Sequence, residues 1–393
     1  MKKNLITFVQ LLTISFLLLS CKHPYEVKNE NVITPAKADL KSAKVNVFIE
    51  NSGSMDGYMH PSSSFKNDLY SYISAISNEV GSTNLNYLNS VIISIPQEPE
   101  SFFNSLNPAS FKKAGLDRSH SEIVDMFKKM LNKLDGNTIN IFASDCILDV
   151  KGGDAKDYFE NKRTTLRDTI ARHLKQYPDF AVEIFMSESS FDGYLYPFQS
   201  SPVRFTGKRP YYVWVFGPKH LIGALNEKVS PYDSFHVGKI QNSASFVNCG
   251  QLPFTLSLRG RVGSSILIKG KKKEFDILAD MSSALLNDEQ IANTNSYTYA
   301  DSKASVESVS RIKDKQSLYT HVMTVKFSNV SKPIKQSIAL PINLEPKWAE
   351  SLNDDSIGVN TQKTYGIKYL IYAISDAYKN ATPAQIQFVI NKK

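Results

Sequence analysis

Cysteine is scarce in this chain: only three residues in 393, at positions 21, 146 and 249. A content this low excludes a small fold stapled by several disulfides. The chain also lacks CxxC and HExxH motifs and its seven histidines are dispersed, so nothing in it indicates zinc catalysis. Cys146 and Cys249 could pair in an oxidising compartment, but they fall in different expected domains. Two buried free thiols are the favoured interpretation, with the disulfide as the alternative.

Long apolar runs are absent after residue 20, so no membrane-spanning helix is predicted there. The uncharged stretch at residues 5–19 is itself shorter than the roughly 20 residues that cross a bilayer. Lys2 and Lys3 precede it and Ser20 follows it. A positive start, a short apolar centre and a small residue before the cut are typical of a secretory signal peptide. We therefore predict that residues 1–20 are removed and take no part in the fold.

Residues 18–21, with the sequence LLSC, resemble the lipobox of bacterial lipoproteins. The resemblance implies that Cys21 becomes the first residue of the mature protein and carries palmitate-type acyl chains in a membrane. The residues after Cys21 lack the adjacent acidic pair that marks surface export in Bacteroidota-type lipoproteins, which this Lys-, Asn- and Tyr-rich chain resembles. We therefore expect the outer membrane, on its periplasmic face.

Positive charge is not concentrated, although the formal net charge is +8. The exception is residues 269–273, KGKKK, which we expect on an exposed hairpin turn. Contact with anionic lipid or polysaccharide is the alternative for this cluster. No nucleic-acid-binding motif is present. Residues 21–43 are polar and rich in Lys and Asn, and they predict a tether between the membrane and the folded part.

Two folded domains are expected from the length that remains. A hydrophobic fraction of 42%, with 22 Phe and 19 Tyr, excludes an intrinsically disordered chain. In residues 44–230, apolar strands alternate with amphipathic helices, which predicts a mostly parallel sheet with helices on both faces. In residues 231–393, short strands with alternating polarity predict a β-rich, sandwich-like domain, and residues 363–379 predict a terminal helix.

The loop after the first predicted strand has the sequence Glu50-Asn51-Ser52-Gly53-Ser54. It resembles the metal-ion-dependent adhesion motif of von Willebrand factor type A domains, Asp-x-Ser-x-Ser. The resemblance covers about residues 44–225 and implies a Rossmann-like fold. Glu50 stands where the family has Asp, which implies either a metal held mainly through water or a site that is weak or lost.

The same resemblance implies two further ligands from later loops. Ser121, which opens a predicted helix, matches the family's second hydroxyl, with Ser119 as a rival. Asp145, at the end of a predicted strand, matches the later Asp. Hydroxyls and a carboxylate suit Mg2+, which takes six oxygen ligands, and Mn2+ or Ca2+ are not excluded. A partner's acidic group would complete the shell.

A second segment, residues 188–194, repeats part of the first: both end in Asp-Gly-Tyr. Both are expected after strands at one edge of the sheet, which places Asp56, Tyr58, Asp192 and Tyr194 on the rim of one partner-binding surface. The alternative is that each Asp-Gly pair only forms a tight turn.

Three functions are weighed on these features. The leading one is a lipid-anchored envelope protein that uses the metal site to hold a protein or glycan partner. The second is a metal-free scaffold of an envelope assembly, favoured by Glu50. The third is a metal-dependent hydrolase or phosphatase with Ser52 or Ser54 as nucleophile, against which no His or Lys lies in the loop.

Overall fold

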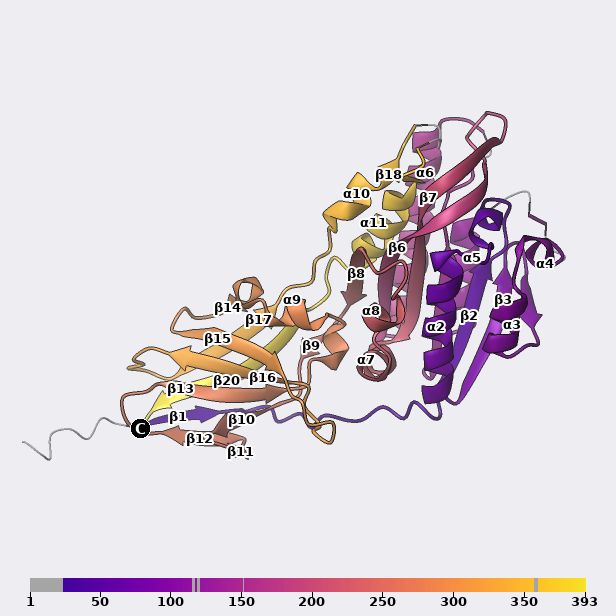
Figure 1. The fold of residues 1–393 in the computed structure, drawn as a ribbon. Helices are drawn as coiled ribbons and strands as arrows, with labels where there is room; N and C mark the ends of the chain where they lie inside the picture. Colours follow the sequence, from indigo (N-terminus) through magenta and orange to yellow (C-terminus); the bar gives the residue numbers. More distant parts are fainter. Residues whose placement is uncertain (1–23, 115–116, 119–120, 151, 357–359) are drawn as a thin grey trace, which may run out of the picture.

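The computed structural model describes residues 24–114, 117–118, 121–150, 152–356 and 360–393. The predicted signal peptide (residues 1–20), Cys21 and Ser119 lie outside the described residues. The described chain forms an α/β domain, at the right of Figure 1, and a β-sandwich at its left. None of the helices among the described residues combines the length and apolar character that crossing a bilayer requires.

The α/β domain is built on a seven-stranded sheet. β2 pairs in parallel with β3 and β5, whereas the four other neighbouring pairs are antiparallel. The expectation of a mostly parallel sheet is wrong: the sheet is mixed. β6 and β7 form a long hairpin, because the link between them is too short for a crossover helix. In spatial order the strands are β4 (Ile92–Ile95), β3 (Ser82–Leu88), β2 (Lys44–Glu50), β5 (Thr138–Ser144), β7 (Val203–Pro218), β6 (Phe180–Leu195) and β8 (Asn242–Val247).

Helices cover both faces of this sheet, as the alternating pattern predicted. Val45, Val47 and Ile49 of β2 face one core and Phe48 faces the other, because successive side chains point to opposite faces. The helices on the Val45 side are α2 (Ser64–Glu79), α3 (Pro99–Ser105), α4 (Pro108–Lys112), α7 (Lys219–Lys228) and α8 (Pro231–Ser234). Those on the Phe48 side are α5 (Ile123–Leu131), α6 (Ala155–Gln176), α10 (Lys347–Ser351) and α11 (Ile367–Ala377).

The β-rich region consists of two sheets that enclose a third core. One sheet contains, in order, β12 (Ser265–Ile268), β1 (Tyr25–Lys28), β20 (Ala384–Lys392), β17 (Ile334–Leu340) and β14 (Thr298–Tyr299), with β9 (Gly250–Gln251) beside β20. The other contains β11 (Arg261–Gly263), β10 (Phe254–Leu258), β13 (Glu274–Ala279), β16 (His321–Phe327) and β15 (Ala304–Arg311). The short elements are η3 (Ser282–Ala284), α9 (Asp288–Ala292), η4 (Thr294–Ser296) and the bridge of β18 (Asn353–Asp354) with β19 (Thr364–Tyr365).

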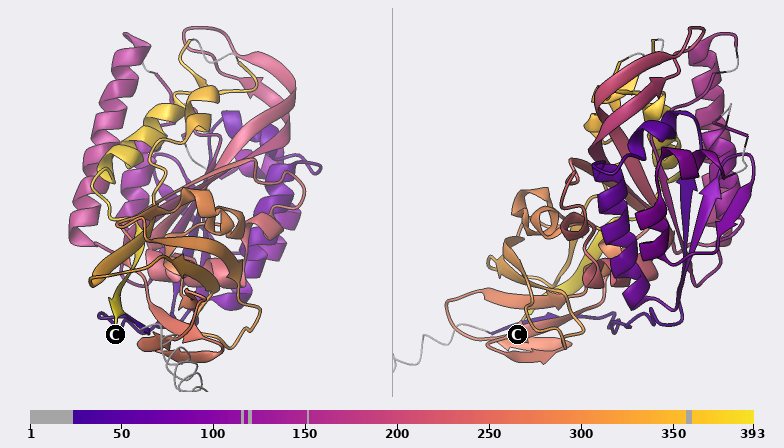
Figure 2. Two further views of the ribbon diagram at one scale, coloured as in Figure 1. Left: turned by 90° about the vertical axis from the view of Figure 1, so that its left-hand side faces the viewer. Right: turned by 45° about the vertical axis from the view of Figure 1, so that its right-hand side comes forward.

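The chain passes between the two domains four times, which the predicted boundaries missed. It starts in the sandwich with β1, so residues 25–28 are not part of a tether. It then builds the α/β domain, and β8 joins that sheet although it lies within the predicted C-terminal domain, residues 231–393. After β17 it returns to the α/β domain with α10 and α11, and it ends in the sandwich with β20, not with a helix. Figure 2 shows the yellow C-terminal segment running through both domains.

Each error has a physical reason. β1 has only four residues, and its alternation of buried Tyr25 and Val27 with outward Glu26 and Lys28 is too short to stand out in a polar region. The alternation in β8 is typical of any half-buried strand. A pattern of this kind predicts a strand but does not say which sheet the strand joins.

Candidate functional site

The loop after β2 carries the first group of predicted ligands. β2 ends at Glu50, and the 3-10 helix η2 (Ser54–Tyr58) begins shortly after it. Asn51 fixes this loop: its backbone N–H donates to Leu88 O at 2.9 Å, and its side-chain amide donates to Phe111 O at 2.9 Å. The loop is therefore held against both β3 and α4.

Glu50 is fully buried, and both of its oxygens accept hydrogen bonds. The Ser121 hydroxyl donates to Oε1 and the Ser144 hydroxyl donates to Oε2. The Ser52 hydroxyl lowers the pKa of this carboxyl group and lies 3.1 Å from the hydroxyl of Ser54. Hydroxyls from the loop after β2, from the end of β5 and from the segment before α5 thus gather beside one buried carboxyl group.

Asp145, directly after β5, is the second buried carboxyl group of the site. Its Oδ1 accepts from the Ile147 N–H at 3.4 Å, and among the described residues its Oδ2 has no hydrogen-bond partner. The next residue, Cys146, has a φ of 56°, in the left-handed region that side-chain-bearing residues rarely adopt. β5 ends at Ser144, and this turn directly follows Asp145, so it helps to fix where the Asp145 carboxyl group lies.

Burial makes both carboxyl groups costly to ionise, and the Asp145 charge adds to that cost for Glu50. Burial, together with the neighbouring Asp145 charge, raises the pKa of Glu50 to about 7, although the serine hydroxyls oppose the shift. Burial likewise raises the pKa of Asp145, against the opposing effect of the Arg209 guanidinium and the Ser54 hydroxyl. Arg209 is 2% exposed and stacks over the Phe191 ring at 5.5 Å. The site thus contains one buried guanidinium, that of Arg209, and two buried carboxyl groups.

The structure brings the five predicted ligand residues together at the carboxyl ends of β2 and β5. They are Glu50, Ser52, Ser54, Ser121 and Asp145. Because β2 and β5 are adjacent and parallel, their ends meet at one edge of the sheet, as the order of the motifs in the sequence predicted.

Arg118 is a residue of this site that the sequence pattern did not indicate. Its guanidinium donates to Ser52 O at 2.6 Å and pairs with the carboxylate of Asp56. It also lies over the ring of Phe111, 5.1 Å from the centroid, and Lys112 contacts Asp56 at 3.5 Å. Arg118 therefore ties the serine loop to η2 and α4.

The predicted rim is only partly correct. Tyr58 is wrong as a rim residue: its side chain is fully buried and its hydroxyl donates to Pro210 O at 2.7 Å. Asp56 is mostly buried in its ion pairs. Asp192 pairs with Arg204, whose guanidinium lies 5.6 Å from the centroid of the Tyr194 ring. Of the four, Tyr194 is the most open to a partner, at 48% exposed.

The repeated Asp-Gly-Tyr segments contact each other through their glycines and not through a shared rim of Asp and Tyr side chains. A Cβ at Gly193 would lie 2.8 Å from the Cα of Gly57, and a Cβ at Gly57 would lie 2.3 Å from the Phe191 ring. Residues 188–194 lie inside β6 and do not form a loop after it. The repeat therefore packs η2 onto β6, and the interpretation as two Asp-Gly turns is wrong for the second segment.

Besides Arg118, pattern reasoning missed Ser144 and Arg209. Ser144 had a signal, since it directly precedes Asp145 at the end of a buried strand. Arg209 had a weaker one: a charged residue that precedes the apolar run of β7. Arg118 lies in a region without periodicity.

The two cysteines among the described residues, Cys146 and Cys249, are both free. The Trp214 Nε1–H donates to Cys146 Sγ at 3.2 Å, and Cys249 Sγ contacts Ser283 O at 3.4 Å. Burial raises the pKa of Cys249 to about 12 and that of Cys146 well above its ordinary value. Neither thiol is set up as a nucleophile.

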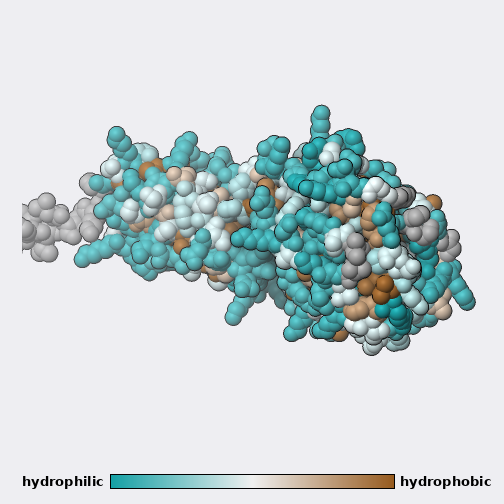
Figure 3. Space-filling view, turned by 90° about the horizontal axis from the view of Figure 1, so that it is seen from above, coloured by the Kyte–Doolittle hydropathy of each residue, from teal (hydrophilic) through white to brown (hydrophobic). Residues whose placement is uncertain are grey.

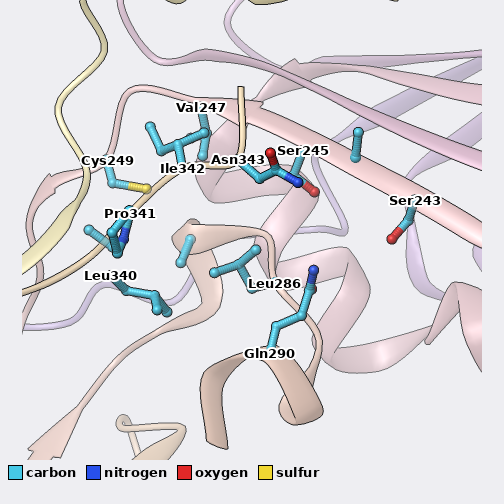
Figure 4. Close-up of a pocket in the computed structure, with 13 residues that line it drawn as sticks. Ser243, Ser245, Val247, Cys249, Leu286, Gln290, Leu340, Pro341, Ile342 and Asn343 are labelled. Carbon is cyan, nitrogen blue, oxygen red and sulfur yellow. The ribbon is translucent and has the colours of Figure 1, made fainter. Parts of the chain in front are cut away.

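Cys249 also lines a small cavity between the domains, shown in Figure 4 with Ser243, Ser245, Gln290 and Asn343 around it. Its volume is about 40 Å³. This space suits a water molecule or two but not an organic ligand. The edge of the sheet at Glu50 and Asp145 remains the candidate site.

No group of three or more His, Cys, Asp or Glu side chains that could hold a metal ion occurs among the described residues. The candidate site differs from such a group because it offers two carboxyl groups and otherwise hydroxyls. Comparison of the chain with protein-family models, with curated proteins and with solved structures found no match.

Proposed function

We propose that this chain is a lipid-anchored binding protein of the cell envelope, which holds a divalent cation between Glu50 and Asp145 to bind a protein or glycan partner. The cation is Mg2+ by preference, with Mn2+ or Ca2+ as substitutes. Cys21 would carry the lipid, on the periplasmic face of the outer membrane. The head would be the α/β domain, with the resemblance to von Willebrand factor type A domains as supporting analogy.

One observation carries the proposal: two buried carboxyl groups lie together, and Asp145 Oδ2 has no hydrogen-bond partner among the described residues. A buried acceptor without a partner costs about 1–3 kcal/mol, more when it is charged. A divalent cation would satisfy that oxygen and offset the cost of burying two carboxylates, which raises both pKa values. Ser52 and Ser54 would add neutral oxygen ligands from the adjacent loop.

The cation would supply a positive charge, and a partner's acidic group would complete its coordination shell. Mg2+ usually keeps several waters and takes only one or two protein carboxylates, which matches a site with two acids and several hydroxyls. The protein's own part is to hold these oxygens in place. Asn51 and Arg118 do this for the serine loop, and the Cys146 turn does it for Asp145.

A second candidate is a metal-free scaffold. The observation in its favour is that both Glu50 oxygens already accept hydrogen bonds from the Ser121 and Ser144 hydroxyls. A Glu50 carboxyl group that these hydroxyls already satisfy needs no cation. In that case the same site would be a structural polar cluster, and any partner would bind elsewhere on the head.

Calorimetric titration of Mg2+ separates the two candidates. The mature chain from residue 21, with Cys21→Ser to avoid acylation, is expected to bind Mg2+ at pH 8. The same chain with Asp145→Asn should bind at least about tenfold more weakly, since one lost charge contact is worth more than about 1.4 kcal/mol at a buried site.

Asp192→Asn is the matched control, because it removes a carboxylate of the same type that is exposed and paired with Arg204. It should titrate like the parent. Equal heats for the parent and the Asp145→Asn chain would reject the cation site and leave the scaffold candidate.

The lipid anchor is tested by labelling. Cells that express the full chain with radioactive palmitate should give a labelled band, and Cys21→Ala should remove the label. A control with Cys249→Ala should keep it. Label that persists in Cys21→Ala would disprove acylation at this residue.

A further inference from the structure

The end of the sandwich where the described chain begins carries an unusual number of lysines. Tyr25, the first residue of β1, lies between Ile268 of β12 and Lys392 of β20. The Lys393 N–H donates to Pro24 O at 2.8 Å, so the chain's last residue lies beside its first described one. The KGKKK turn, residues 269–273, directly follows β12 at this same end.

Contacts of Lys273 with Tyr25 and Asn329 place the lysine turn at this end. The Lys273 ammonium lies 5.6 Å from the centroid of the Tyr25 ring and donates to Asn329, which also accepts from the Tyr25 hydroxyl at 3.0 Å. Lys332 lies three residues after Asn329, in the loop before β17. We call this set the basic end: Lys269, Lys271, Lys272, Lys273, Lys332, Lys392 and Lys393.

Most of these side chains are exposed. Two of them have acidic partners: Lys272 pairs with Glu274 at 2.7 Å and Lys393 pairs with Glu26 at 2.8 Å. No carboxylate among the described residues pairs with Lys269 or Lys271. The basic end therefore keeps a net positive charge. Figure 3 shows the upper face of the molecule, where hydrophilic side chains surround smaller hydrophobic areas.

We propose that the basic end docks on the anionic phospholipid headgroups of the membrane that carries the anchor. The placement rests on the lipid anchor in the proposed function. Cys21 precedes Pro24 by three residues, and an extended chain spans at most about 3.6 Å per residue. Pro24 is thus held within about 11 Å of an acylated Cys21, which is about one Debye length at 0.1 M salt.

At about one Debye length, salt weakens the attraction between the lysines and the anionic headgroups but does not abolish it. A lysine near an anionic leaflet contributes about 1 kcal/mol, and several act together. A basic surface beside the acyl chains adds to the attachment. In Figure 1 the basic end lies at the lower left and the loops after β2 and β5 lie at the upper right. Docking at the basic end therefore turns the Glu50–Asp145 edge away from the membrane.

The test uses the mature chain from residue 21 with Cys21→Ser, so that no acyl chain contributes. The vesicles consist of phosphatidylcholine with about a third of anionic phosphatidylglycerol. At low salt the protein should sediment with these vesicles. It should not sediment with pure phosphatidylcholine vesicles, and salt near 0.5 M should release it. The triple variant Lys269→Gln, Lys271→Gln, Lys272→Gln should bind about 100-fold more weakly, from three lysines at that contribution.

The matched control neutralises three exposed lysines of the α/β domain, at positions 133, 156 and 175, and should bind like the parent. Circular dichroism and thermal unfolding of both triple variants verify that each is folded. Equal binding of the two triple variants, or equal binding to vesicles with and without phosphatidylglycerol, overturns the proposal. Neither outcome depends on Mg2+ or on palmitate, so a failure here is distinct from a failure of the proposed function.

Discussion

Replacement of Gly193 by alanine is expected to lower the free energy of unfolding by about 2–3 kcal/mol. The new Cβ would lie 2.8 Å from the Cα and 3.0 Å from the N of Gly57, and these backbone atoms cannot rotate away as a side chain can. η2 would have to move off β6. Because η2 begins at Ser54, the change should also weaken Mg2+ binding. Urea denaturation and the calorimetric titration measure the two effects.

Gly136→Ala is the control for this prediction. No atom lies within 4 Å of a Cβ at Gly136, so its stability should change by no more than about 0.5 kcal/mol. If Gly193→Ala proved as stable as Gly136→Ala, the contact between the two Asp-Gly-Tyr segments would not hold η2 in place.

Glu183→Gln is expected to make the protein more stable than the parent at pH 9 and to flatten its dependence on pH. Glu183 is buried in the α/β core, where it accepts from the Asn226 amide at 2.9 and 3.1 Å. Burial raises its pKa from 4.5 to about 8, with the Asn226 and Ser245 bonds opposing the shift. The amide of glutamine has the shape of the protonated acid but carries no charge to desolvate.

The sign follows from the raised pKa. The folded protein holds this proton more tightly than the unfolded chain, so the stabilisation is complete below pH 4.5 and is lost as the pH rises through about 8. At about 1.4 kcal/mol per pKa unit, the loss across this window is about 4–5 kcal/mol. The raised pKa of Glu50 also lowers the free energy of unfolding as the pH rises, between pH 4.5 and about pH 7.

Chemical denaturation between pH 5 and 9, with a chelator present, measures the effect. Glu188→Gln, on the same strand but partly exposed, should keep the parental dependence on pH. An unchanged slope in Glu183→Gln would mean that the buried Glu183 is not the group that titrates. Added Mg2+ should alter the slope that Glu50 contributes but not the one that Glu183 contributes.

The parts of the site that could be predicted are those with a regular backbone around them. Val45, Val47 and Ile49 mark a buried strand by alternation, and the polar residues after such a strand fall at the edge where ligands bind. The same reasoning located Asp145 after β5. Neighbouring parallel strands then bring the two loops together without any further information.

The parts that could not be predicted depend on packing at longer range. Tyr58 follows a turn-rich loop and looked exposed, but η2 aims it into the core, where Phe65 and Phe191 surround it. Arg118 reaches the serine loop from a segment without periodicity. The hairpin of β6 and β7, one of the antiparallel pairs that make the sheet mixed, depends on a short link whose direction no pattern of polarity reveals. β1 was not predicted because it has only four residues.

The placement of β1 has a mechanical consequence. If a partner bound at the cation site pulls against lipid at Cys21, the covalent path between them is short: it runs through β1, the connection at residues 29–43, and β2 to Glu50. Both strands are flanked on each side by hydrogen-bonded neighbours. Tension along either strand would shear all of its ladder bonds at once, so the molecule would resist pulling along the one line from membrane to partner.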